Sequence, residues 1–451
     1  MSTKPPGGTR DFLPEEIRRR EYVIGIVRDV YERHGFEPLE TPALENIDTL
    51  LGKYGEESNK LIFKILRRGE HEARGEADLA LRYDLTVPLA RVVAQHQNEL
   101  PRFFKRYQIQ PVWRADRPAR GRFREFYQCD IDAMGSTSCL VEVELLAAVN
   151  EVMARLGFND VVVRLNHRRV LAGLLESSGI PVERHADALV ALDKLDKLGN
   201  EGVLAEMASR GIAADAALRG LKLAAEPSLA VHRLALQGLK DAGAHLAAVD
   251  QLDEIMELSK QTPAAGHIRI DPSLARGLSY YTGAIMEIAV PDLAGSLGGG
   301  GRYDNLIGMF LGRDVPACGF SLGLERIIVV MTERNMFPVE ITRGAVDVMV
   351  TIWNHETRNH SLALAAELRR AGLRVDVYPE ADKIGKQFKY ASSRSVPFVV
   401  VLGDDERARG EVAIKDLRSG DQKSISRADA PEFIAQRVSS EPRTEDLEPE
   451  S

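Results

Sequence analysis

The stretch WRADRPARGRFREFYQCDID, residues 113–132, carries the strongest structural signal in this chain. Five arginines fall between positions 114 and 124, and alternating polar and apolar residues flank them on both sides. This pattern predicts strands at 103–114 and 122–134, joined by an arginine-rich loop. Only one acidic residue, Asp116, accompanies these arginines. The planar guanidinium group of arginine can donate two hydrogen bonds to phosphate oxygens at once. We therefore predict that the loop meets phosphate or RNA, and the alternative is a solvated, charged hairpin.

The second strand of this hairpin should have two unlike faces, because successive side chains alternate. The polar face would carry Arg122, Arg124, Phe126, Gln128, Asp130 and Asp132. The other face is mostly apolar, could pack on helices, and would carry Phe123, Glu125, Tyr127, Cys129 and Ile131. Buried carboxylates and amides need partners. A polar ligand on the first face would supply them, and Arg114, at the end of the preceding strand, should point toward it.

Upstream of the hairpin, helices and extended segments alternate. Residues 15–35 have the apolar spacing of an amphipathic helix, and Pro14 suits its first turn. Residues 61–68 and 79–83 are predicted strands, and a helix is expected after them. Asp84 falls in the first turn of that helix, where the helix dipole favours a carboxylate.

Downstream of the hairpin, the chain changes character twice. Residues 168–260 are rich in Ala, Leu, Lys, Asp and Glu, which predicts a helical block inserted into an α+β domain. A linker is expected near 338–345. The order strand, helix, strand, helix, strand then predicts a small domain with a largely parallel sheet. The acidic tail, 438–451, shows no periodicity and is predicted to be disordered.

Composition restricts the class of protein. The chain has 451 residues, of which 44% are hydrophobic and 28% charged, as expected for two to four folded domains. No apolar run approaches the ~20 residues of a membrane helix, and the start lacks the apolar core of a signal peptide. Three cysteines without CxxC pairing argue against a disulfide framework or a zinc ribbon and fit a reducing cytoplasm. The net charge of −8 argues against non-specific coating of nucleic acid but allows a local basic surface.

Three further segments carry weaker signals. GSLGGGGRYDNLIGMF, residues 295–310, matches neither a P-loop nor a dinucleotide fingerprint, and alone it predicts a flexible turn. ACGFSLGLERIIVVM, residues 317–331, predicts a strand, a glycine turn and a helix with Arg326 in its first turn. A cation there opposes the helix dipole, so Arg326 is better explained by a bound anion than as a surface residue. RGLSYYTG, residues 276–283, is either a polar pocket wall or ordinary sheet packing.

In this order the segments resemble those of class II aminoacyl-tRNA synthetases, and specifically the histidyl-tRNA synthetase family. The match spans about residues 7–435 and rests on GTRDFLP, GFEPLETPALE, RYDLTVPLAR, the arginine hairpin from Phe103, RGLSYYTG and ACGFSLGLERI. The resemblance implies an α+β catalytic domain with an antiparallel sheet (1–167 and 261–335) and a helical insertion domain (168–260). It also implies a C-terminal α/β anticodon-binding domain (345–437), a homodimer and a cytoplasmic location.

The resemblance also implies roles in binding histidine. The α-amino group would be held at Asp84, Leu85, Thr86 and Gln128. The imidazole would be read by Asp132 and Tyr281, with Tyr280 beside them. Arg114 would bind the amino-acid carboxylate and the α-phosphate of ATP, and Arg276 would stabilise that phosphate from the other side. Ser279 stands where the family commonly has an acid, and strand alternation should turn it away from Tyr280.

The remaining implied roles concern ATP and tRNA. Arg122 and Arg326 would hold the outer phosphates, with Mg2+ bridging them, and Glu125 would lie near the adenine. The loop Arg117–Arg120 would approach the acceptor end of tRNA(His). No metal site made of protein ligands alone is expected, because the ten histidines show no metal-binding spacing.

The resemblance implies ATP-dependent attachment of L-histidine to tRNA(His) through a histidyl-adenylate. One alternative is a non-catalytic relative, the regulatory subunit of ATP phosphoribosyltransferase. That family typically lacks the last domain, and its sequences do not keep the RGLSYYTG motif intact. This chain keeps Arg276, Tyr280, Tyr281, Arg326 and the last domain. A second alternative is an RNA-binding or sensor module without turnover, which the set of arginines disfavours.

Overall fold

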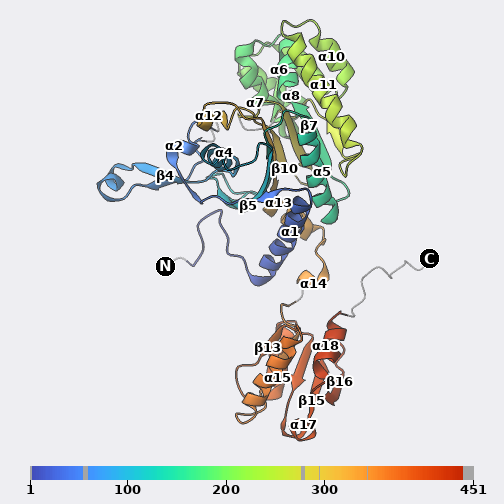
Figure 1. Ribbon diagram of the computed structural model, residues 1–451. Coiled ribbons are helices and arrows are strands. Elements are labelled where there is room, and N and C mark those ends of the chain that lie inside the picture. The colour runs from blue at the N-terminus through green and yellow to red at the C-terminus, as the bar shows by residue number, and fades with distance from the viewer. Residues whose placement is uncertain (1–2, 54–58, 276–279, 294, 343, 440–451) are drawn as a thin grey trace, which may run out of the picture. The chain divides into compact units, whose positions relative to one another are not determined.

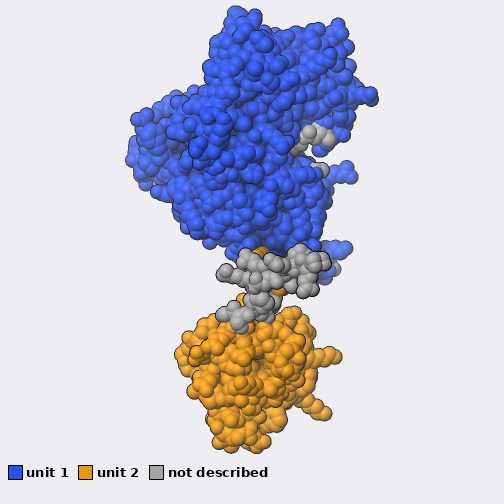
Figure 2. All heavy atoms as spheres, turned by 90° about the vertical axis from the view of Figure 1, so that its right-hand side faces the viewer, with its two compact units in different colours: residues 1–337 blue, residues 338–451 orange. Residues whose placement is uncertain are grey.

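The protein is described by a computed structural model that covers residues 3–53, 59–275, 280–293, 295–342 and 344–439 (Figure 1). The chain divides into two compact units, residues 1–337 and 338–451, which are described separately (Figure 2). Among the residues covered, none of the helices combines the length and the hydropathy that a bilayer span requires.

The first unit is built on an eight-stranded sheet with the strand order β1-β5-β6-β11-β10-β9-β7-β8. All neighbours are antiparallel except the edge pairs β1 with β5 and β7 with β8. The bounds are β1 Glu37–Pro38, β5 Phe104–Trp113, β6 Glu125–Met134, β7 Val162–His167, β8 Ile268–Ile270, β9 Ala284–Ala289, β10 Ser296–Arg302 and β11 Ala317–Gly323. The arginine-rich stretch is indeed the loop of the hairpin β5–β6, which occupies one half of this sheet.

Three helices cover one face of the sheet: α1 Pro14–Arg33, α5 Leu140–Arg155 and α13 Leu324–Glu333 (Figure 1). Cys129 and Ile131 of β6 are completely buried beneath them. Pro14 begins α1, where the missing N–H costs no hydrogen bond. The alternation of β6 therefore buries its apolar side chains under helices and turns its polar side chains to the opposite face.

The opposite face of the sheet packs against a smaller subdomain. It contains α2 Ile47–Leu50, α4 Thr86–Gln95, α12 Gly308–Leu311, the short 3-10 helix η1 Gly69–Arg74, and a three-stranded sheet of β2 Leu44–Asn46, β4 Ala77–Leu81 and β3 Lys64–Leu66. The strand expected at 61–68 is shorter, because the chain turns into η1 soon after Leu66. Leu89 and Tyr83 pack with Phe104 and Met134 at the ends of the hairpin strands.

The segment between β7 and β8 is helical. It contains α6 Arg168–Ser177, η2 Val182–Arg184, α7 His185–Leu192, α8 Leu195–Ser209, α9 Ala214–Ala224, α10 Leu229–Leu236 and α11 Ala242–Ser259. Most of these helices share a small core of alanine, leucine and methionine side chains, while α11 packs on α5, α6 and β7. This block thus packs on the eight-stranded sheet through both α6 and α11.

The second unit has a five-stranded sheet with the order β13-β12-β14-β15-β16. Its elements are α14 Val339–Thr342, β12 Val348–Val350, α15 Arg358–Arg370, β13 Val375–Val377, α16 Ile384–Ser393, β14 Phe398–Val401, α17 Asp404–Arg409, β15 Glu411–Asp416, β16 Gln422–Ser426 and α18 Ala430–Ser439. The first three strands are parallel, as the sequence predicts. The prediction missed β15, which pairs antiparallel with β14, and the short, exposed edge strand β16 that follows it.

Two further predictions of local structure are wrong. The four glycines Gly298–Gly301 do not form a flexible turn but lie in β10, between β9 and β11. The strand expected from residue 122 begins only at Glu125, and residues 119–122 form a tight turn closed by reciprocal backbone bonds between Ala119 and Arg122. Period-two alternation therefore does not apply to Arg122, Phe123 and Arg124.

Candidate active site

A cleft of about 310 Å³ opens over the polar face of β6 and the glycine strand β10. It brings together eight of the residues predicted for the site: Asp84, Thr86, Arg114, Arg122, Gln128, Tyr280, Tyr281 and Arg326. Phe123, Asp116, Ser321 and Glu325 also line it, although the sequence analysis gave none of them a role. The remaining predicted residues lie elsewhere or outside the described residues.

Three predicted residues lie away from the cleft wall. Leu85 is completely buried beside it, and Asp132 is buried beneath it at 2% exposure. Glu125 accepts a hydrogen bond of 2.8 Å from the indole Nε1 of Trp113. Arg276 and Ser279 lie outside the described residues, so their predicted roles stay predictions.

The glycine strand forms the floor of the cleft because its neighbours leave no room for side chains. A Cβ atom on Gly300 would lie 2.1 Å from the carbonyl oxygen of Gly319, and one on Gly298 would lie 2.5 Å from that of Ser321. Contacts below 3.0 Å force one strand to move. The run of glycines is therefore a requirement of strand packing in β10 and β11, and it exposes backbone where a ligand can lie close.

One end of the cleft is polar and suited to a small amino-acid ligand. Asp84 accepts a hydrogen bond from the N–H of Val87 at 3.1 Å, which orients its carboxylate at the start of α4, and from the hydroxyl of Tyr280 at 3.3 Å. Gln128 donates to Ser321 Oγ at 2.9 Å. Burial raises the pKa of Tyr281, so its hydroxyl stays protonated and can donate. Together these groups offer a carboxylate, an amide and hydroxyls to a ligand.

A buried polar layer lies beneath this end. The β5–β6 register places Arg106 opposite Asp132, Gln108 opposite Asp130 and Gln110 opposite Gln128. Asp132 pairs with Arg106 at 2.8 Å and accepts a hydrogen bond from Tyr303. Sequence reasoning missed Arg106 and Tyr303, although the alternation in KRYQIQ, residues 105–110, already marks Arg106 as part of a polar face.

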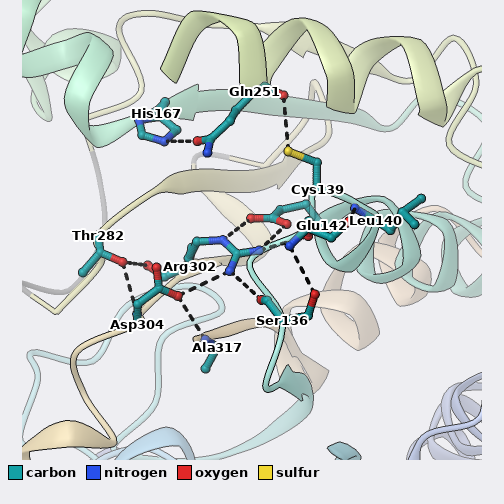
Figure 3. Close-up of polar contacts among 11 residues, drawn as sticks. Ser136, Cys139, Leu140, Glu142, His167, Gln251, Thr282, Arg302, Asp304 and Ala317 are labelled. Carbon is teal, nitrogen blue, oxygen red and sulfur yellow. Dashed lines mark hydrogen bonds and ion pairs between the residues drawn. The ribbon is translucent and has the colours of Figure 1, made fainter. Parts of the chain in front are cut away.

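The segment that carries the tyrosines is tied to the helix layer through a second buried ion pair (Figure 3). The backbone N–H of Thr282 donates to the carbonyl of Arg302 at 2.7 Å. The guanidinium of Arg302 in turn makes a two-pronged contact with Glu142 of α5 at 2.6 and 2.7 Å, and it also bonds Asp304 and the carbonyl of Ser136. Arg302 thus fixes the end of β10 and the segment beside it.

The other end of the cleft is basic. Arg114 donates to the carbonyl of Tyr83 at 3.0 Å and stacks over the rings of Tyr83 and Phe126. Arg326, in the first turn of α13, donates to the carbonyl of Ser296 at 2.6 Å and to that of Gly121 at 3.3 Å. With Arg122 they bring three guanidinium groups from three segments to one wall. Such a wall is suited to phosphate, because each guanidinium offers several fixed donors.

Metal binding by protein side chains alone finds no support in the part of the chain that the structure describes, where no cluster of His, Cys, Asp and Glu could hold an ion. Besides Asp84, three carboxylates line the cleft, those of Asp116, Glu287 and Glu325. Both oxygens of Glu325 have partners, the guanidinium of Arg20 at 2.8 Å and the N–H of Tyr127 at 2.9 Å. Glu287 pairs with the guanidinium of Arg164 at 3.4 Å, so Asp116 is the carboxylate that could join phosphate oxygens around a cation such as Mg2+.

Comparison with known proteins agrees with these features. Residues 8–327 match the family model of histidyl-tRNA synthetase, and residues 347–437 match that of an anticodon binding domain. The histidine–tRNA ligase of Christiangramia forsetii is 41% identical over 94% of this chain and 98% of its own length. The histidine–tRNA ligase of Gloeobacter violaceus is 42% identical over 96% of this chain and 98% of its own length.

Comparison with solved structures also finds similarity to histidyl-tRNA synthetases. The crystal structure of histidyl-tRNA synthetase from Nostoc sp. PCC 7120 superposes with a TM-score of 0.81 and 31% identity over 97% of this chain and 100% of that one. The structure from Bacillus halodurans described as an ATP phosphoribosyltransferase regulatory subunit/histidyl-tRNA synthetase shares the fold, with a TM-score of 0.71, at only 22% identity. From its motifs, its cleft and these matches over nearly its full length, the chain belongs to the histidyl-tRNA synthetase family.

Proposed function

We propose that this protein attaches L-histidine to tRNA(His) at the expense of ATP, releasing pyrophosphate and then AMP. The observation that carries the proposal is one cleft that gathers Asp84, Gln128 and the tyrosines together with Arg114, Arg122 and Arg326. Arg114 bonds to the carbonyl of Tyr83, next to Asp84, so an amino acid held by Asp84 would have its carboxylate close to a phosphate held by Arg114. Relatives at about 41% identity that bear the name histidine–tRNA ligase support the same activity.

In the first step, a carboxylate oxygen of histidine attacks the α-phosphorus of ATP, and the bond to pyrophosphate breaks. Negative charge spreads over the phosphate oxygens, so fixed guanidinium groups stabilise the transition state without a strong base. Arg114 would bind the α-phosphate and the carboxylate, Arg122 and Arg326 would hold the outer phosphates, and Arg276 would act on the α-phosphate from the other side. Mg2+ bound to the phosphates, with Asp116 beside them, would supply further neutralisation of their charge.

In the second step, the terminal ribose hydroxyl of tRNA attacks the carbonyl carbon of histidyl-adenylate. AMP leaves, and its phosphate can accept the hydroxyl proton. The loop Arg117–Arg120, which sits on the rim of the cleft, would approach the acceptor end of the tRNA. Glu125, which was expected near the adenine, would act there only if its bond to Trp113 were exchanged for one to the nucleotide.

Histidine would be selected by the polar end of the cleft. Asp84, Thr86 and Gln128, next to the buried Leu85, would hold its amino group. Tyr281 and Tyr280 would contact the imidazole directly, and Asp132 would reach it from the layer beneath. Imidazole has one donor and one acceptor, so a site with paired polar groups rejects apolar side chains strongly.

The second unit would bind the anticodon of the tRNA. Its order β13-β12-β14 places the first strand between the other two, which creates a switch point at the carboxyl ends of β12 and β14. In open α/β sheets, ligands bind at such a point. Trp353 follows β12 there, lies against Gly403 and is 47% exposed. An exposed indole suits stacking on an unpaired base.

The proposal extends to the organisation of the protein. The catalytic domain would comprise 1–167 and 261–335, the insertion domain 168–260, and the anticodon-binding domain 345–437, followed by the acidic tail 438–451. The functional unit would be a cytoplasmic homodimer. The regulatory relative of ATP phosphoribosyltransferase is disfavoured because the arginine wall and the second unit are both present.

The decisive experiment is the exchange of labelled pyrophosphate into ATP, run separately with each of the twenty amino acids and without tRNA. Exchange that depends on histidine alone would support the adenylation step and its specificity. Absence of exchange, with histidine still bound in a calorimetric titration, would favour the regulatory relative instead. Charging of tRNA(His) with labelled histidine then tests the second step.

A further inference from the structure

The N-terminal segment 7–13, here called the N-terminal strap, runs along the arginine-rich loop and is bonded to it. The backbone N–H of Arg124 donates to the carbonyl of Gly8 at 2.8 Å, and its guanidinium donates to the carbonyl of Gly7 at 3.2 Å. The same guanidinium donates to the carbonyl of Asp116 at the other side of the loop, at 3.1 Å. Arg124 thus ties the loop to the strap and does not point into the cleft as predicted from strand alternation.

Gly8 is required for this close contact. Its φ of +87° lies in the left-handed region, which favours glycine. A Cβ atom there would lie 2.7 Å from Cγ of Arg124. A side chain at position 8 would therefore push the strap away from the loop.

Arg10 of the strap reaches the side chain that forms the cleft wall. Its guanidinium carbon lies 3.7 Å from the ring centroid of Phe123, which lines the cleft next to Arg122. Such a cation–π contact fixes the orientation of an aromatic ring. The rest of Arg10 is exposed, so its removal leaves the hydrophobic core intact.

The contacts continue from the strap toward the far wall of the cleft. Phe12 lies under both Arg10, at 4.8 Å, and Arg20, at 4.2 Å. Arg20 is buried and pairs with Glu325 at 2.8 Å. Glu325 lines the cleft and also accepts the N–H of Tyr127. The strap therefore contacts the loop directly and reaches the start of α13 through Arg20.

We propose that the N-terminal strap positions the arginine loop for ATP, with Arg10 acting through Phe123 and Gly8 acting through Arg124. Arg10 is a positioning residue in this account and does not touch substrate. The inference rests on the proposed function only in taking ATP as the ligand of the basic end. It predicts a larger effect on ATP than on histidine, because the residues that the strap contacts, Phe123 and Arg124, lie next to Arg122 in the chain.

The first test measures the dissociation constants of ATP and histidine by equilibrium dialysis, together with both KM values in pyrophosphate exchange. Arg10→Ala should weaken ATP binding about five- to tenfold, the size of one such contact, and leave histidine within about twofold. Arg33→Ala is the matched control, since it also removes an exposed arginine, from the end of α1. Arg10→Lys keeps the cation and should recover most of the loss.

A double variant separates positioning from a general structural role. If Arg10 acts through the ring, Arg10→Ala should add less than about twofold to the ATP loss of Phe123→Ala. Gly8→Ala should weaken ATP binding through the same loop. The proposal would be overturned if the losses of ATP affinity in Arg10→Ala and Phe123→Ala were additive. It would also be overturned if Arg10→Ala weakened histidine and ATP binding equally, or if it bound ATP as well as Arg33→Ala does. Wild-type protein that neither binds ATP nor exchanges pyrophosphate would instead refute the proposed function.

Discussion

At the scale of single residues, the polar layer under the histidine end sets the charge of its carboxyls. Asp130 is 2% exposed, and burial raises its pKa to about 7, with Asp132 adding to the rise and Arg106 opposing it. Its pKa in the unfolded chain is ~3.9. Between these values the folded protein binds the proton more strongly, so the contribution of Asp130 to stability is present at low pH and is lost as the pH rises toward 7.

This sign gives a testable pH dependence. The free energy of unfolding of wild-type protein, minus that of Asp130→Asn, should fall by about 2 kcal/mol between pH 5 and 7. The comparison cancels the titration of other groups, because both proteins share them. Urea unfolding at several pH values measures it. A difference that stays constant across this range would mean that Asp130 is ionised throughout.

The buried pair of Arg302 and Glu142 provides a second prediction at this scale. The two residues are 7% and 2% exposed, so removing one partner leaves an uncompensated charge in the interior. Arg302→Met should destabilise the first unit by about 3–5 kcal/mol. Urea unfolding followed by tryptophan fluorescence checks this value.

The double variant Arg302→Met/Glu142→Leu is the control for that experiment, because it removes both charges. It should regain much of the stability, since well-packed apolar residues can replace a buried pair. A double variant no more stable than Arg302→Met would show that the loss arises from the other contacts of Arg302, with Asp304 and Ser136.

At the scale of elements, the strand β10 is the one that tolerates amino-acid substitution least. Its glycines allow β9 and β11 to approach on either side while the backbone remains open to the cleft. The strand thus combines a packing requirement with a binding surface. Four glycines in a row would otherwise weaken a strand, because glycine loses more conformational entropy than other residues.

Substitution of one glycine tests this account. Gly300→Ala would place Cβ 2.1 Å from a backbone oxygen that cannot move without separating two strands. We expect a loss of more than about 3 kcal/mol in stability, or failure to fold. Gly25→Ala is the matched control, because its Cβ meets nothing within 4 Å on helix α1. That variant should be stabilised by up to about 1 kcal/mol, and equal melting temperatures for the two would contradict the argument.

At the scale of the whole molecule, the chemistry of the two units can be separated. In the proposed function, adenylation would need only the cleft of the first unit, whereas charging would also need tRNA, for which the second unit would offer Trp353. Mutations in the second unit should therefore affect the charging of tRNA and leave pyrophosphate exchange unchanged.

Trp353→Ala is the direct test of this separation. We expect KM for tRNA in the charging reaction to rise about tenfold or more, the size of one lost base-stacking contact, with pyrophosphate exchange unchanged. Leu362→Ala, another exposed apolar residue of the second unit, should change neither assay. A loss of exchange activity in Trp353→Ala would show that the two units do not act separately.

The hairpin, the order of its strands, the helical block and the parallel half of the second unit can all be predicted from local sequence patterns. These features rest on local periodicity and on turn residues, which act over a few neighbouring positions. The sequence also brought out Arg114, Arg122, Gln128 and Arg326, because arginines without acid partners and polar side chains in a buried strand call for a ligand.

Contacts between side chains from distant segments depend instead on how the whole chain packs. Asp132 accepts a hydrogen bond from Tyr303, which is 171 residues away in the sequence. The glycine run is a strand because β9 and β11 flank it, and the N-terminal strap reaches Arg124 across 117 residues. Partners so distant along the chain are chosen by packing, and no local pattern in either segment contains that information.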